Sequence, residues 1–195
     1  MLTESHGPDI EGVDELVVLV DESGAPIGNA DKRTVHTADT PLHLAFSCYL
    51  LGDDGRLLLT RRALSKPTWP GVWTNSFCGH PAPDEKMSDA VRRRAAQELG
   101  AGIRSLRLVL PGFRYRATDA GGIVENEVCP VFIGVIDGDL APNPAEVAEW
   151  EWVTPEDVLE AVQRTPFAFS PWLIEQLAQM DLVAEAALSM EGRTT

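Results

Sequence analysis

Basic residues are scarce in this sequence. It contains 16 lysines and arginines against 30 aspartates and glutamates, which gives a formal net charge of −14 at pH 7. A general nucleic-acid-binding protein, or one that lies on an anionic membrane, needs an excess of positive charge. We therefore expect neither nucleic acid nor a membrane among the partners of this protein.

Long hydrophobic segments are also lacking. Residues 42–51 are the most apolar stretch and are about as long as one strand, whereas a helix needs ~20 apolar residues to span a bilayer. Residues 1–15 are acidic and contain no apolar stretch, which is not typical of a signal peptide. Cys48, Cys78 and Cys129 cannot all pair within one chain, and an odd number fits a reducing compartment. We expect a cytoplasmic protein.

The rest of the composition is that of an ordinary globular domain. The 195 residues are 44% hydrophobic and 24% charged. A chain of this length forms about one domain and buries roughly 70% of its unfolded surface. We predict a single domain at residues 13–190, with loose tails at residues 1–12 and 191–195.

Strand and helix patterns alternate along the chain. We predict strands at residues 16–21, 42–51, 57–61, 106–110, 113–117, 125–136 and 151–153, and helices at residues 89–99, 155–163 and most of 171–190. Ser88 is expected to cap the first helix and Gly100 to end it. Pro130 predicts an edge or a bulge in its strand. This mixture predicts an α/β or α+β sandwich, with a mixed sheet flanked by helices.

Three histidines and two glutamates offer ligands for a metal: His36, His43, His80, Glu125 and Glu127. On a strand, the two glutamates point to the same face, where their carboxylates repel each other unless a proton or a cation lies between them. Imidazoles and carboxylates together suit Mn²⁺, Zn²⁺ or Mg²⁺. Spacing alone does not bring the five together, and they can equally be separate, solvated polar residues.

Cys78, Gly79 and His80 form a second polar group. If this segment is extended, Cys78 and His80 share a face, and Gly79 lets a substrate approach the backbone. A nearby imidazole or cation would lower the pKa of the Cys78 thiol and make it a usable acid or base. The alternative is a buried, unreactive cysteine.

The few basic residues are grouped near these polar segments: Lys32, Arg33, Arg61, Arg62, Lys66 and Arg94. In a protein of this net charge, an anionic ligand needs such a cluster, and arginine forks suit phosphate oxygens. Ordinary surface charges are the alternative. Trp69, Trp73 and Trp172 can fill the core, or their ring faces can stabilise a cation.

Part of the chain has the spacing of the Nudix box, at Gly79, Glu85, Arg93, Glu98 and Gly100. The match is incomplete, because Arg94 replaces one glutamate of the box and Gln97 replaces another. Only Glu98 of the usual metal-binding trio is present. Such a helix should hold a catalytic Mg²⁺ poorly, so pyrophosphate hydrolysis is not expected.

Longer motifs resemble type I isopentenyl-diphosphate isomerases, a branch of the Nudix superfamily. They are HTADTPLHLAFS at residues 36–47, TRRALSK at 60–66, WPGVWTN at 69–75 and CGHP at 78–81, together with Tyr115, the triplet at 125–127 and Trp172. The resemblance extends over about residues 16–179. It implies a Nudix-like catalytic domain in isoprenoid biosynthesis. The implied reaction is a 1,3-allylic proton shift that converts isopentenyl diphosphate to dimethylallyl diphosphate.

The resemblance also implies which residues bind. The positions that match the family's ligands of an inner Mn²⁺ or Zn²⁺ are His36, His43, His80, Glu125 and Glu127. Glu98 matches the residue that holds Mg²⁺ on the substrate diphosphate. The positions that match the family's diphosphate clamp are Lys32, Arg62, Lys66 and Arg94. We expect a small diphosphate as the partner and a monomeric enzyme.

Cys78 and Glu127 match the two proton-transfer groups, with Tyr115 beside Glu127 and Trp172 as an aromatic wall. Protonating an isolated alkene produces a tertiary carbocation that water would trap. The site must therefore supply an acid, exclude water and stabilise positive charge. Which of the two groups acts first stays open, as does the identity of the inner metal.

Two other functions are weighed against the isomerase. A Nudix pyrophosphatase would release phosphate or pyrophosphate, which the replacements at Arg94 and Gln97 argue against. A non-catalytic protein that binds metal and diphosphate would bind isopentenyl diphosphate without exchanging its protons. Assaying isopentenyl diphosphate in D₂O distinguishes all three.

Overall fold

The computed structural model describes residues 15–191 of the chain. The predicted tails at 1–12 and 192–195 lie outside the described residues. Glu191, which was also assigned to the C-terminal tail, is instead the last residue of helix α5 (Leu182–Glu191). Within the described part of the chain, no helix combines the length and the hydrophobicity needed to cross a membrane.

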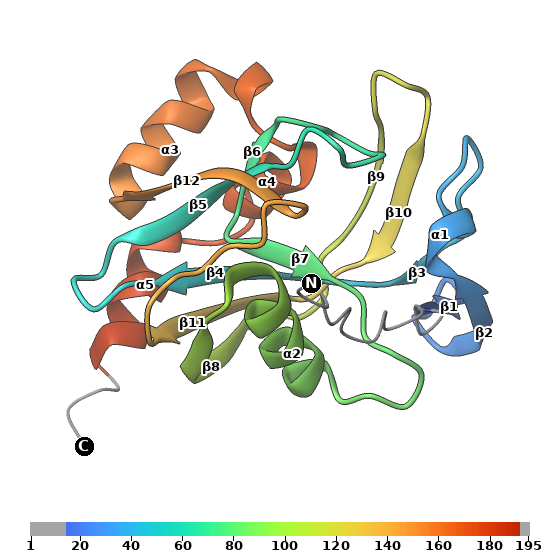
Figure 1. The fold of residues 1–195 in the computed structure, drawn as a ribbon, viewed down its shortest axis with the longest axis horizontal. Coiled ribbons are helices and arrows are strands. Elements are labelled where there is room, and N and C mark those ends of the chain that lie inside the picture. Colours follow the sequence, from blue (N-terminus) through green and yellow to red (C-terminus); the bar gives the residue numbers. More distant parts are fainter. Residues whose placement is uncertain (1–14, 192–195) are drawn as a thin grey trace, which may run out of the picture.

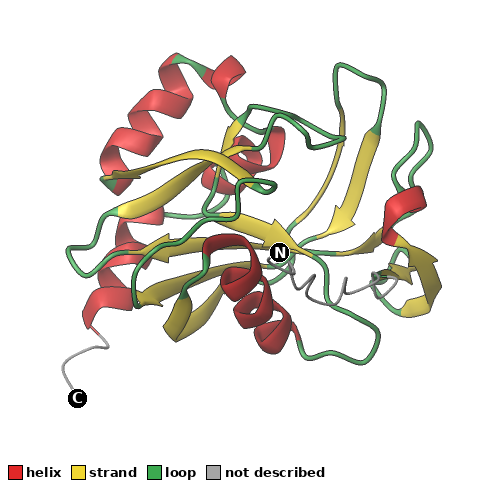
Figure 2. Cartoon of the chain, in the orientation of Figure 1, coloured by secondary structure: helices red, strands yellow, loops and turns green. Residues whose placement is uncertain are grey.

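The strands form two mixed sheets with helices packed around them (Figures 1 and 2). The five-stranded sheet has the order β2-β1-β3-β10-β9, from β1 (Leu16–Val20), β2 (Pro26–Asp31), β3 (His43–Leu44), β9 (Arg114–Thr118) and β10 (Val124–Val128). The seven-stranded sheet has the order β12-β5-β4-β11-β8, from β4 (Phe46–Leu51), β5 (Leu57–Arg62), β8 (Gly102–Leu110), β11 (Val131–Asp137) and β12 (Val147–Val153). In the same sheet, β6 (Trp73–Thr74) pairs with β5, and β7 (Phe77–Gly79) pairs with β4.

The remaining helices are α1 (Lys32–Val35), α2 (Met87–Leu99), α3 (Pro155–Arg164), η1 (Pro166–Ala168) and α4 (Pro171–Leu177). They confirm the predicted α+β sandwich of mixed sheets flanked by helices. The sequence did not predict α1 or β2. All of β2 is exposed or half-buried, so it lacks the apolar alternation by which a strand is recognised.

Two segments predicted as single strands cross from one sheet to the other. Residues 42–51 break at Ala45 into β3 and β4, and residues 125–136 break after Val128 into β10 and β11. The crossings lie side by side, because β3 pairs with β10 and β4 with β11, both in parallel. One continuous strand with a bulge was therefore the wrong prediction. Pro130, which has no N–H for a sheet hydrogen bond, lies in the break itself.

The seven-stranded sheet has a core on each face. Side chains alternate along β4, so that Phe46 and Leu50 join the cluster under α2, whereas Tyr49 and Leu51 join the cluster under α3, α4 and α5. All four side chains are fully buried. Each such side chain contributes about 1.5–3 kcal/mol when it is removed from water. Packing on both faces makes this sheet a rigid base for the polar residues at its edge.

Helix α2 begins two residues earlier than predicted. Lys86 occupies the N-cap position without a side-chain hydrogen bond, and Ser88 lies inside the helix, where its hydroxyl donates to Asp89 Oδ1 at 3.4 Å. The predicted Ser88 cap is therefore wrong. The predicted end is confirmed, because Gly100 has a φ of 64° and its N–H closes the last turn on Ala96 O.

We expect Gly100→Ala to destabilise the fold more than Gly24→Ala. Both glycines have a left-handed φ, of 64° and 83°, which costs a residue with a Cβ about 1–2 kcal/mol. A Cβ on Gly100 would lie 2.7 Å from Ala141 O, while a Cβ on Gly24 would meet nothing within 4 Å. Overpacking should therefore cost Gly100→Ala about 1–3 kcal/mol more in urea unfolding. Equal losses in the two variants would contradict this account.

Candidate active site

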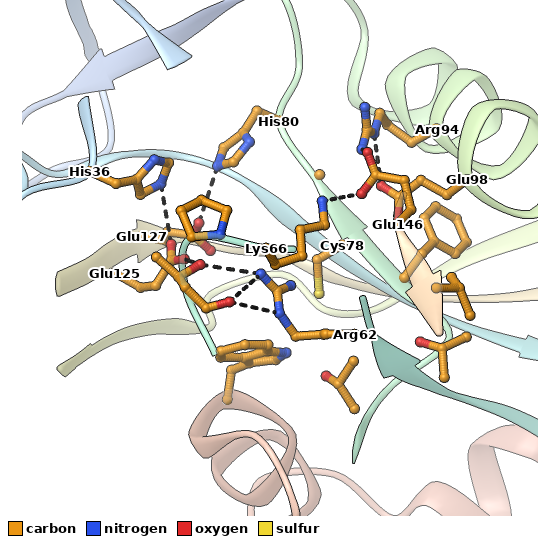
Figure 3. Close-up of a pocket in the computed structure, with 18 of the residues that line it drawn as sticks. His36, Arg62, Lys66, Cys78, His80, Arg94, Glu98, Glu125, Glu127 and Glu146 are labelled. Carbon is orange, nitrogen blue, oxygen red and sulfur yellow. Dashed lines mark hydrogen bonds and ion pairs between the residues drawn. The ribbon is translucent and has the colours of Figure 1, made fainter. Parts of the chain in front are cut away.

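A cavity of about 150 Å³ is lined by residues of both sheets and of helices α2 and α4 (Figure 3). Every site residue that the resemblance implied lines this cavity except His43. The side chain of His43 is wholly buried, yet it belongs to a cluster of possible metal ligands with two histidines that do line the cavity. The fold therefore brings together residues that lie far apart in the sequence.

Three histidines and a glutamate form that cluster. Each of His36, His43, His80 and Glu127 offers one donor atom, and these four atoms all lie within 4.8 Å of one another. Strand pairing places them, because His43 on β3 is the register partner of Glu127 on the parallel strand β10. His80 follows β7 directly, and its Nε2 lies 3.2 Å from Glu127 Oε1.

The histidine nitrogens are oriented as metal ligands. His43 Nδ1 lies 2.9 Å from Pro41 O, so Nδ1 carries the proton and the lone pair of Nε2 faces the cluster. The Nε2 atoms of His36 and His43 are buried and have no hydrogen-bond partner. They face Glu125 Oε2 at 3.3 Å and Glu127 Oε1 at 3.5 Å. Lone pairs that face carboxylates across such a gap, in an N/O donor set, fit a bound divalent metal.

Glu125 lies next to this cluster but outside the four mutually close donors. It points to the same face of β10 as Glu127, as predicted, and both are buried. Its Oε1 accepts a hydrogen bond from Thr68 Oγ1 at 2.9 Å. Thr68 thereby holds the carboxylate of Glu125 against His36.

Two groups of the cluster have protonation states that suit a metal. Burial alone would raise the pKa of Glu127, but its interactions with the imidazoles of His43 and His80 outweigh burial and hold the pKa well below its usual range. Burial lowers the pKa of His80 to about 4, although Glu127 opposes this. The pKa of His43, which burial lowers, is raised overall by Glu127. An ionised Glu127 and a neutral His80 are the forms that bind a metal ion.

Four basic side chains line another part of the cavity. Lys66 forms an ion pair with Glu146, and Arg94 with both Glu98 and Glu146 (Figure 3). Lys32 pairs with Glu15 at 2.5 Å. Burial raises the pKa of Glu98 even though the Arg94 guanidinium opposes it.

Arg62 completes this set. Its Nη2 donates to Thr68 O at 2.9 Å, and its guanidinium carbon lies 5.5 Å from the centre of the Trp172 ring. The Trp172 ring is buried and lies 5.7 Å from that of Tyr115, centre to centre. Four cationic side chains therefore lie beside an aromatic wall, and three of them, Lys32, Lys66 and Arg94, are paired with carboxylates.

Cys78 lines the cavity from strand β7. Its sulfur lies 3.3 Å from Ser47 Oγ and donates to Asn75 Oδ1 at 3.4 Å. Burial raises the pKa of the thiol to about 12, although both of these hydrogen bonds oppose the rise. The neighbouring Arg62 guanidinium lowers this pKa, as expected of a cation, but burial outweighs it and the net shift is upward.

Gly79 lines the cavity, and neighbouring side chains fill the direction that its own side chain would take. A Cβ at this position would lie 2.8 Å from Arg94 Cγ and 2.9 Å from Phe46 Cζ. Approach of a substrate to the Gly79 backbone stays a prediction. The missing side chain allows close packing of Arg94, which in turn reaches the cavity.

Comparison with known proteins identifies the family. A NUDIX domain model matches residues 41–173. The chain is 64% identical over 163 residues to the isopentenyl-diphosphate Delta-isomerase of Clavibacter michiganensis, covering 84% of each chain. It is 54% identical over 178 residues to that of Brevibacterium linens, covering 91% of this chain and 98% of that protein. This chain belongs to the isopentenyl-diphosphate Delta-isomerase family.

Two solved structures share the fold of this isomerase family member at low sequence identity. A Deinococcus radiodurans protein matches with a TM-score of 0.65 at 23% identity, covering 85% of this chain and 98% of that one. A MutT protein from Methanosarcina mazei matches with a TM-score of 0.58 at 19% identity, covering 79% and 97%. Both confirm the predicted Nudix-like sandwich.

The sequence did not single out several residues of this isomerase family site. Glu146 pairs with two clamp residues but lies in a segment without a motif, so nothing in the sequence identified it. Thr68 and Asn75 lie within or beside quoted motifs. They carry no ionisable group, and their importance appears only in their hydrogen bonds to Glu125 and Cys78.

Proposed function

We propose that this chain catalyses the metal-dependent 1,3-allylic proton shift that converts isopentenyl diphosphate to dimethylallyl diphosphate. The observation that carries the proposal is a single cavity that combines a histidine–glutamate cluster, the Cys78 thiol and four basic side chains. The names of relatives at 54–64% identity support the same reaction. Because one chain supplies the whole cavity, we infer a single catalytic domain that acts as a monomer.

The diphosphate serves as the anchor of the substrate. Lys32, Arg62, Lys66 and Arg94 bind its oxygens, and no phosphate bond breaks. Binding energy from this end of the molecule positions the carbon skeleton between the reacting groups. Glu98, which lies beside Arg94 in the cavity wall, would hold a Mg²⁺ together with the diphosphate.

His36, His43, His80 and Glu127, with Glu125 beside them, would hold an inner Mn²⁺ or Zn²⁺. The unpartnered Nε2 atoms of His36 and His43 support this assignment. Such an ion supplies a concentrated positive charge and a fixed geometry for its ligands. The N/O donor set suits either metal, so availability in the cell decides between them.

Cys78 and Glu127 are the two proton-transfer groups. One delivers a proton to the terminal CH₂ carbon of the alkene, which leaves a tertiary carbocation at the branched carbon. The other removes a proton from the carbon next to it, so the double bond moves by one position and no atom is lost. Tyr115 is the register partner of Glu127 on β9 and lines the same cavity, so we assign its hydroxyl to relay the proton.

Trp172 protects and stabilises the carbocation. Its ring lines the cavity and is itself buried, so its face can lie against the positive charge in a site that excludes water. A cation–π contact is worth about 0.5–1 kcal/mol at an exposed site and about 2 kcal/mol or more when it is desolvated. Excluding water also prevents hydration of the carbocation, which would give an alcohol.

Hydrolysis of the diphosphate is the competing activity within the Nudix superfamily. It is disfavoured because Arg94 stands at a carboxylate position of the box and its guanidinium pairs with Glu98, the one remaining carboxylate. The box positions of this helix therefore offer a single carboxylate, which can hold Mg²⁺ only together with a substrate diphosphate and not as the full trio of the box does.

The test is an NMR assay of isopentenyl diphosphate in D₂O, with and without a chelator. We expect dimethylallyl diphosphate that carries deuterium, and a loss of turnover of at least about 100-fold when metal is removed, because the proton-transfer geometry depends on it. Released phosphate or pyrophosphate would instead identify a hydrolase. Binding without any deuterium exchange would identify a non-catalytic protein.

A further inference from the structure

A row of three hydrogen-bonded, buried polar side chains lies behind Cys78, and none of the three lines the cavity. It consists of Ser47 and Tyr49 on strand β4 and Gln176 on helix α4, all three with no exposed surface. Tyr49 OH donates to Gln176 Oε1 at 2.8 Å, and Gln176 Nε2 donates to Ser47 Oγ at 2.9 Å. Ser47 is the register partner of Cys78, and its Oγ lies 3.3 Å from the Cys78 sulfur.

The hydrogen bonds in this row of side chains all donate in one direction, from Tyr49 through Gln176 to Ser47. Burial raises the pKa of Tyr49 well above its usual range, so the phenol keeps its proton and can donate it to Gln176. An amide N–H₂ only donates, so Ser47 Oγ accepts from Gln176. The single hydroxyl hydrogen of Ser47 is then left for a sulfur, either Cys78 at 3.3 Å or Cys129 at 3.5 Å.

The other side of the Cys78 sulfur is fixed as well. Asn75 Oδ1 accepts from the Cys78 thiol at 3.4 Å, and it also accepts from Thr74 Oγ1 at 2.9 Å and Trp172 Nε1 at 3.1 Å. An amide oxygen cannot donate, so the thiol hydrogen points to Asn75. The Ser47 hydroxyl lies nearer to this sulfur, at 3.3 Å, than to that of Cys129, at 3.5 Å, so we assign its hydrogen to Cys78. The sulfur is thereby held between a donor and an acceptor.

We propose that Gln176 and Tyr49 are positioning residues that act through Ser47 to hold the Cys78 sulfur toward the substrate carbon. The inference rests on the proposed isomerase function, because it assigns a role only if Cys78 transfers a proton. Ser47, Tyr49 and Gln176 do not line the cavity. They therefore affect proton transfer and not substrate binding.

The test compares kcat and KM for Ser47→Ala and Tyr49→Phe. Ser47→Ala removes the group that touches the sulfur, and we expect kcat to fall about 10- to 100-fold. Tyr49→Phe removes the hydroxyl at the end of the hydrogen-bonded row that is farthest from Cys78. We expect kcat to fall about 3- to 10-fold, as for one lost hydrogen bond. KM for isopentenyl diphosphate should stay within about twofold in both, because neither contacts the diphosphate clamp.

Ser76→Ala is the matched control. Ser76 is as buried as Ser47, and its hydroxyl donates to Leu58 O, away from the Cys78 sulfur. It should lower thermal stability by a similar amount and leave kcat unchanged. The double variant Ser47→Ala/Tyr49→Phe should have the same kcat as Ser47→Ala alone, because the tyrosine acts only through the serine.

The outcomes separate the two claims. If the wild-type protein does not isomerise isopentenyl diphosphate, the proposed function fails. If it does, a wild-type kcat in Tyr49→Phe and Ser47→Ala overturns the positioning role. Losses that multiply in the double variant, or an equal loss in Ser76→Ala, would also overturn it, because these are the results of a general structural effect. If Ser47→Ala does not fold, Tyr49→Phe decides alone.

Discussion

Replacing Cys78 by alanine is expected to abolish the formation of dimethylallyl diphosphate while the fold persists. The side chain is small and half-buried, so its loss removes little packing. It does remove one of the two proposed proton-transfer groups, and a positioned acid or base contributes about 10²- to 10⁴-fold to rate. We expect a loss of about 10³-fold or more in kcat, measured by NMR in D₂O, with circular dichroism and metal content unchanged.

Cys48→Ala is the control for this experiment. Cys48 is fully buried in the core cluster under α2, on the face of β4 opposite Ser47, and it does not line the cavity. Its loss costs packing but should leave kcat within about twofold, since no reacting group is touched. Normal turnover by folded Cys78→Ala would show that the proposed proton transfer is wrong.

Replacing Glu127 by glutamine should lower kcat at least as much as Cys78→Ala does. The amide has the shape of the carboxylate but no negative charge, and the buried His43 and the half-buried His80 face that charge at 3.5 and 3.2 Å. The variant loses a group that we propose both as a proton-transfer residue and as a charged metal ligand. We expect kcat to fall by about 10³-fold or more, and bound Mn²⁺ or Zn²⁺ to fall by at least about tenfold in elemental analysis.

Glu149→Gln provides the comparison. Glu149 lies on β12, where its exposed carboxylate pairs with Arg61 at 2.9 Å, outside the cavity. Exposed ion pairs contribute about 0–1 kcal/mol, so stability, metal content and turnover should all stay close to wild type. Full activity in Glu127→Gln would show that Glu127 is not a proton-transfer group. Full metal content without activity would show that Glu127 transfers a proton but is not needed to hold the metal.

The sequence and its motifs indicated most of the residues that form the site. They did not show how the fold brings those residues together. The spacing of Glu125 and Glu127 predicted that both carboxylates share a face of one strand, and they do. No local pattern places His43 beside Glu127, because their contact depends on the parallel pairing of β3 with β10 across more than eighty residues. Only the resemblance to a family linked these positions.

The fold was predicted in outline, and its errors have local causes. Residues 42–51 are mostly apolar and alternate like one continuous strand, so nothing in the sequence shows that the chain changes sheets at Ala45. Pro130 was recognised as an interruption but not as the exit from a sheet. The net upward shift in the pKa of Cys78 was not predicted, because sequence shows the charges near a thiol but not how deeply the thiol is buried.

The two strand crossings, from β3 to β4 and from β10 to β11, also join the sheet that carries Glu127 to the sheet that carries Cys78. Glu127 belongs to the five-stranded sheet and Cys78 to the seven-stranded one. At the junction, Ala45 N donates to Val128 O at 2.9 Å and Ser47 N donates to Pro130 O at 3.1 Å. Two adjacent, hydrogen-bonded main-chain segments therefore connect the sheet that carries Glu127 to the sheet that carries Cys78. We expect the relative placement of these two proposed proton-transfer groups to follow from the strand pairing of the fold itself.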